Sequence, residues 1–79
     1  SMNNKFPMPT DAEQVRCLKV HQALIAELNL AEREGAQPVE LLTALAAASV
    51  EAVTRLIGPD AVAAWFEQQA ETVTLARSK

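Results

Sequence analysis

The two glycines of this chain are its most restrictive feature, because each stands shortly before a proline, at Gly35 with Pro38 and at Gly58 with Pro59. Glycine favours the left-handed conformation that ends a helix, and proline suits the first turn of the next helix. The segments on either side show no sustained period-two alternation and no Asn-Gly or Asp-Gly turn. The sequence therefore predicts an all-α chain of three helices.

The first predicted helix begins at Thr10 and ends at Gly35. Thr10 to Glu13 has the form of a capping box, in which the hydroxyl and the carboxylate each accept a hydrogen bond from a free backbone N–H. Apolar and weakly polar residues gather on one side when successive residues are placed 100° apart. They are Cys17, Leu18, Val20, His21, Leu24, Ile25, Leu28 and Ala31.

The second helix is predicted from about Pro38 to Ile57, and its apolar positions cover more than half of its circumference. They are Leu41, Leu42, Leu45, Ala46, Ala48, Ser49, Ala52, Val53, Leu56 and Ile57. We expect this helix to be the central element and to contact more than one neighbour.

The third helix is predicted to start directly after Gly58-Pro59-Asp60 and to fray near Arg77. Its apolar face comprises Val62, Trp65, Phe66, Gln69, Val73 and Ala76. Together the three helices predict a three-helix bundle-like domain, an antiparallel helical hairpin plus a third helix, over residues 10–79. Residues 1–9 are expected to be a flexible tail, in which Ser1 before Met2 is the remnant of a cleaved tag.

Self-association is expected because a chain of 79 residues has a small core, and much of its 49% hydrophobic content is alanine. A net charge of -3 disfavours nucleic acid and anionic membranes as partners. A helix-turn-helix interpretation fails for the same reason, since Arg77 is the only basic residue of the third helix before Lys79. A lone cysteine and the absence of a signal-like start or an apolar span predict a cytoplasmic protein.

Cys17 and His21 are the one pair that suggests chemistry, because positions i and i+4 of a helix lie one turn apart. Two ligands do not complete a zinc site, so a metal would need carboxylates or the same pair from a second subunit. A cysteine nucleophile would also need an oxyanion site, which no glycine-rich loop supplies. We therefore expect both residues to be buried packing residues, with no metal, no cofactor and no catalytic role.

The function predicted from these observations is a non-enzymatic helical protein–protein interaction module that acts as a homodimer. In this dimer the second helix and part of the first or third helix pack against the second copy. The alternatives are a metal- or small-molecule-binding bundle that uses Cys17 and His21, and a compact transcriptional or phage-type regulator. The overall pattern is similar to that of many short bacterial proteins, which implies no activity. The candidate interaction surface consists of Trp65, Phe66, Gln69, Leu42 and Val53.

Overall fold

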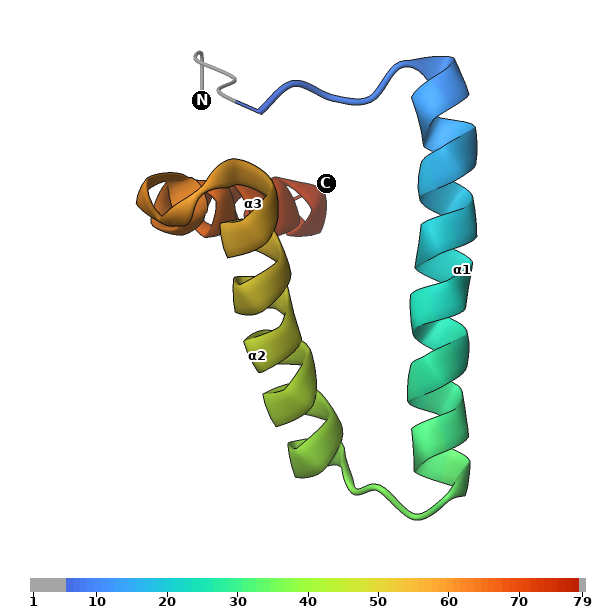
Figure 1. Ribbon diagram of the computed structural model, residues 1–79. Coiled ribbons are helices and arrows are strands. Elements are labelled where there is room, and N and C mark those ends of the chain that lie inside the picture. The colour runs from blue at the N-terminus through green and yellow to red at the C-terminus, as the bar shows by residue number, and fades with distance from the viewer. Residues whose placement is uncertain (1–5, 79) are drawn as a thin grey trace. The chain divides into compact units, whose positions relative to one another are not determined.

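Three α-helices and one 3₁₀ turn make up the computed structural model, which describes residues 6–78 (Figure 1). The helices are α1 (Asp11–Arg33), α2 (Pro38–Ile57) and α3 (Val62–Arg77), and the 3₁₀ turn η1 (Pro59–Ala61) precedes α3. No strand occurs within the described residues. The all-α class and the three helices are thus confirmed, while their packing as a bundle and the dimer stay predictions.

The chain divides into two compact units, Ser1–Thr43 and Ala44–Lys79, with the boundary inside α2. The first unit holds α1 and the first turns of α2, and the second holds the rest of α2, η1 and α3. The predicted single domain over residues 10–79 stays a prediction. The expected tag remnant at Ser1 and the tail up to residue 5 lie outside the described residues.

The capping box predicted at the start of α1 is present. The backbone N–H of Thr10 donates to Oε1 of Glu13 over 2.9 Å, and the backbone N–H of Glu13 donates to Oγ1 of Thr10 over 3.3 Å. Two backbone donors that the helix itself leaves unpaired are satisfied in this way. The start of α1 therefore follows from local sequence alone.

Gly35 ends α1 with a positive φ of 108°, as the sequence predicts. The backbone N–H of Gly35 donates to the carbonyl of Glu32, and that of Ala36 donates to the carbonyl of Ala31, each over 3.0 Å. These two bonds form a Schellman motif, which satisfies carbonyls at the end of the helix. The turn after α1 is thus formed by backbone hydrogen bonds and by the positive φ of Gly35.

Gln37 and Glu40 start α2 immediately after this turn. The backbone N–H of Gln37 donates to Oε1 of Glu40 over 2.7 Å, while its side-chain amide donates to the carbonyl of Gly35 over 3.2 Å. Pro38 fills the first helical position, where its missing N–H costs nothing. The connection between α1 and α2 is therefore short and hydrogen-bonded.

Gly58 separates α2 from η1, and its backbone differs from the expected left-handed cap. Its φ of 88° and ψ of 155° lie in a region that essentially only glycine adopts. The expected immediate start of the third helix is also corrected, because the 3₁₀ turn Pro59–Ala61 precedes α3. The N–H of Ala61 accordingly donates to the carbonyl of Gly58, at 3.3 Å, three residues earlier.

Burial is sparse and concentrated in the second unit. Val53 of α2, 8% exposed, is the one buried side chain within residues 6–78. Val62, Trp65 and Phe66 at the start of α3 are half-buried. Most of the large apolar residues of α2 are exposed, and the expectation that α2 is the central element stays a prediction.

Candidate functional site

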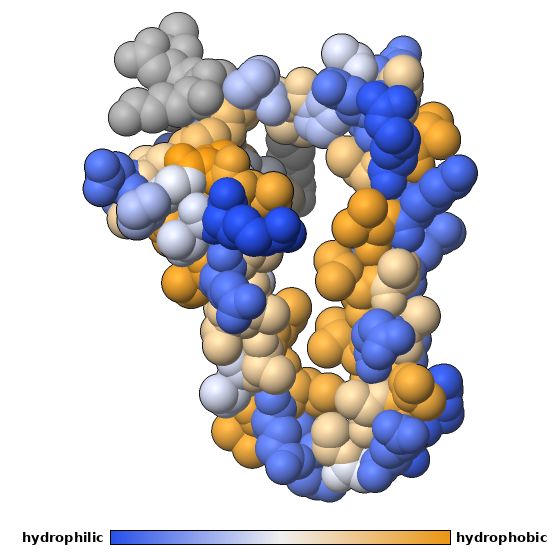
Figure 2. Space-filling model, in the orientation of Figure 1, coloured by the Kyte–Doolittle hydropathy of each residue, from blue (hydrophilic) through white to orange (hydrophobic). Residues whose placement is uncertain are grey.

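The stripe predicted on α1 is present as an exposed surface, here called the α1 stripe. It comprises Cys17, Leu18, Val20, His21, Leu24, Ile25 and Leu28. All but the half-buried Leu28 are exposed, Leu24 to 57% and Val20 to 60%. Figure 2 shows hydrophobic side chains in a row along one edge of α1. No element of the first unit covers this row, because beyond the tail and the turn that unit contains only α1 and residues 38–43 of α2.

Cys17 and His21 lie one turn apart in this stripe and are both exposed. The expectation that they are buried packing residues is therefore wrong for the chain as the structure describes it. The physical reason is that the first unit provides no second helix against the middle of α1. Burial of a helical stripe depends on a neighbour, and the periodicity of the stripe does not supply one.

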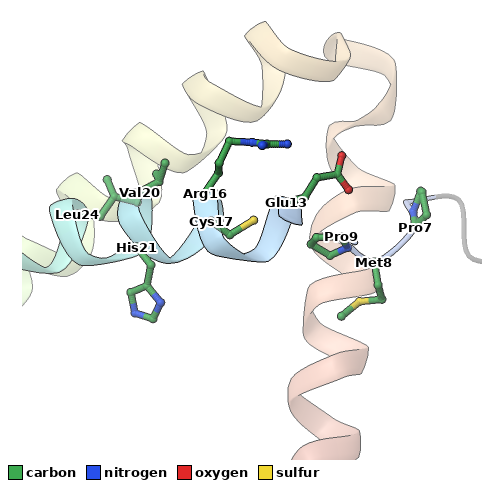
Figure 3. A pocket seen from close by; sticks show the side chains of 9 residues that line it. All are labelled: Pro7, Met8, Pro9, Glu13, Arg16, Cys17, Val20, His21 and Leu24. Carbon is green, nitrogen blue, oxygen red and sulfur yellow. The ribbon is translucent and has the colours of Figure 1, made fainter. Parts of the chain in front are cut away.

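An open hollow of about 740 Å³ lies beside this pair. Its lining consists of Pro7, Met8, Pro9, Glu13, Arg16, Cys17, Val20, His21 and Leu24 (Figure 3). Figure 3 shows the imidazole of His21 pointing outward from α1 rather than toward the sulfur of Cys17. Within residues 6–78, no three His, Cys, Asp or Glu side chains are grouped so that they could hold a metal ion.

The segment before Thr10 is expected from the sequence to be an extended or frayed tail whose Phe6 and Met8 can lie down on the helices, but no hollow is predicted there. Pro7, Met8 and Pro9 line the hollow next to the first turns of α1. The two prolines are the signal that could have indicated this, because they hold the chain extended just before the cap. The side-chain amide of Gln14 also donates to the carbonyl of Pro9 over 3.4 Å.

Glu13 lines the hollow and also caps α1. The hydrogen bond from the backbone of Thr10, followed by that with its side chain, holds the pKa of the Glu13 carboxyl below its ordinary value of 4.5. A hydrogen bond to the charged form favours that form. Glu13 is therefore a structural carboxylate that caps α1.

The five candidate surface residues are divided between the two units. Leu42 belongs to the first unit and is 66% exposed. Val53 is buried, and Trp65, Phe66 and Gln69 are half-buried, all within the second unit. The rings of Trp65 and Phe66 meet edge to face, with centroids 5.1 Å apart and an interplanar angle of 87°. This geometry is favourable for aromatic pairs and fixes the two rings against each other.

Comparison of the chain with protein families, with curated proteins and with solved structures finds no match. Among the described helices, none is by itself long and apolar enough to cross a membrane. Within residues 6–78, α2 taken together with Pro59–Arg77 reaches the required length and composition, as a pair bent by 119°.

Proposed function

We propose that this chain is a non-enzymatic helical protein–protein interaction module that acts as a homodimer. The observation that carries the proposal is the exposed α1 stripe, whose apolar side chains follow helical spacing and are not covered within their own unit. Contiguous exposed apolar surface of this kind marks interaction sites in proteins.

The small core supports the same proposal. Val53 is the one buried side chain of the described residues, while Leu42, Leu45 and Leu56 of α2 are exposed to 42% or more. Domains of this size often obtain the missing apolar burial from a second copy. A dimer would therefore stabilise the fold as well as create the binding surface.

The chemistry of the surface favours a protein partner over other classes. The net charge of -3 opposes contact with phosphate-rich partners, both nucleic acids and anionic membranes. Cys17 and His21 lie in the middle of a helix, and a nucleophile there would still need donors for an oxyanion. A cytoplasmic location, inferred from the lone cysteine, belongs to this proposal.

Sedimentation equilibrium tests the proposal directly. We expect about twice the chain mass of 8.5 kDa at micromolar concentration. Leu24→Asp in the α1 stripe should yield single chains, because it places a charge in the apolar contact. The matched control is Val15→Asp, which adds the same charge on the opposite side of α1. A single-chain mass for the parent up to about millimolar concentration, the limit of weak affinity, would contradict the proposal.

A second candidate function, binding of a metal or small molecule, is favoured by the hollow beside Cys17 and His21. A thiol and an imidazole suit soft and borderline metal ions. Elemental analysis of the same fractions distinguishes the two functions. A stoichiometric metal that is lost in both Cys17→Ala and His21→Ala would favour the second candidate.

A further inference from the structure

Four residues of the α1 stripe recur at the spacing of a two-helix contact. Cys17, His21, Leu24 and Leu28 follow one another at intervals of four, three and four residues. Alternating intervals of four and three residues are typical of the contact line between two paired helices. These four residues are here called the seam. The first three are exposed and Leu28 is half-buried, so the seam has no partner over most of its length in the first unit.

We propose that the seam binds α1 of a second copy of this chain, with the two helices antiparallel. This inference rests on the proposed homodimer and names the surface that forms it. Pairing about the midpoint of the seam places Cys17 opposite Leu28 of the partner subunit and His21 opposite Leu24 of the partner subunit. Every seam residue then has an opposite residue, and the arrangement is isologous.

Charges at the edge of the seam favour this orientation. Arg16 and Glu27 are eleven positions apart in the numbering, which places them about 20° apart around the helix, on the same edge. In an antiparallel pair the same edges of the two helices meet, so Arg16 faces Glu27 of the partner subunit. The two-fold symmetry repeats this opposite-charge pair. The part of the chain that the structure describes provides no ion pair for either residue.

A parallel pair would have the opposite electrostatics. In a parallel pair, a residue on one side of the seam lies near a residue on the other side of the partner's seam. The two residues are about five positions apart in the numbering. Glu27 would then approach Glu32 of the partner subunit, twice by symmetry. Like charges at this position are unfavourable. The charge pattern therefore separates the two orientations, and it favours the antiparallel one.

Disulfide trapping tests the orientation. In Leu28→Cys, mild oxidation should link Cys17 to position 28 of the partner subunit and produce a covalent dimer on a non-reducing gel. The two positions of one helix are about 16 Å apart along the axis, too far for a disulfide within the chain. The parent chain, with Cys17 alone, should stay unlinked, because its two thiols lie on opposite sides of the symmetry axis.

Charge reversal tests the edge contact independently. Arg16→Glu should weaken the dimer roughly tenfold at low salt, through two lost pairs and new repulsion. Addition of Glu27→Arg in the same chain should restore the parent affinity. The matched control, Lys19→Glu, makes the same charge change away from the seam and should leave the affinity unchanged.

The outcomes separate this inference from the proposed function. A dimer in which the parent chain is linked through Cys17 would be parallel, and a dimer in which neither protein is linked would use another surface. Either result overturns the antiparallel seam and leaves the homodimer intact. A single-chain mass for the parent overturns both.

Discussion

The start of α3 and the middle of α1 carry similar apolar stripes, yet they differ in burial. Val62, Trp65 and Phe66 of α3 are half-buried, whereas Leu18 and Leu24 of α1 are exposed to 54% and 57%. This difference in burial comes from the residues that follow the turn in each unit, the turn at Gly58 in the second unit and the turn at Gly35 in the first. Beyond Gly58 stands an aromatic pair, whose large rings can cover neighbouring atoms.

In the first unit the reversal leads only to residues 38–43 of α2. Those residues extend about 9 Å, against about 34 Å for α1, so most of α1 lies beyond their reach. From α1 onward in this unit, the half-buried residues lie near the turn, at Leu28, Ala31, Ala36 and Leu41, while Phe6 and Pro9 are half-buried before α1. Side chains in this chain are thus buried mainly near the turns between helices and beside aromatic residues. Helical periodicity by itself does not bury them.

Trp65→Ala should have the largest effect and would test this comparison directly. We expect the free energy of unfolding to fall by about 3 kcal/mol, near the lower end for loss of a large aromatic side chain, since Trp65 is half-buried. Urea titration followed by far-ultraviolet circular dichroism measures this loss, and it should be similar at all protein concentrations.

Leu24→Ala is the control for that experiment. In a single chain the substitution should change the unfolding free energy by less than about 0.5 kcal/mol, because Leu24 is exposed. In the proposed dimer the loss should grow as the protein concentration rises. Equal and concentration-independent losses for the two variants would mean that the α1 stripe is packed within the chain.

The two reversals can be compared by substitution of their glycines. Gly58→Ala and Gly35→Ala place a Cβ in open space, but each forces a side chain onto a positive φ. We expect a cost of about 1–2 kcal/mol for each, due to backbone strain. Hydrogen exchange should speed up around Val53 and Trp65 for Gly58→Ala, and around Leu28 and Leu41 for Gly35→Ala. If the two variants showed the same pattern of hydrogen exchange, the turns at Gly35 and Gly58 would unfold together.

The smallest expected effect is the pH dependence of the cap on α1. Because folding lowers the pKa of Glu13, its contribution to stability is complete above the ordinary value of 4.5 and is lost as the pH falls through the lowered pKa. Glu13→Gln keeps an acceptor for the N–H of Thr10 but cannot titrate. The difference in stability between parent and variant should therefore change with pH only below about 4.5, and a difference that varies above that value would assign the effect to another group.

Local features of the chain could be predicted because each depends on residues only a few positions apart. Thr10 and Glu13 cap α1 as expected, Gly35 takes the positive φ that ends it, and Pro38 starts α2. The 3₁₀ turn after Gly58 was missed, because Gly-Pro-Asp permits both a tight turn and an immediate helix. The pair Cys17 and His21 was correctly placed on one face of α1, yet it was wrongly expected to be buried.

The sequence by itself therefore determined the helices, their ends and the faces on which apolar residues gather, since backbone hydrogen bonds and helical spacing are local properties. Only the tertiary structure decided which of these faces are covered. Val53 is buried and Leu24 is exposed although both occupy apolar stripes, because burial requires atoms from elsewhere in the chain or from another chain. The hollow beside Cys17 likewise depends on where Met8 and the two prolines lie against α1, which no helical periodicity specifies.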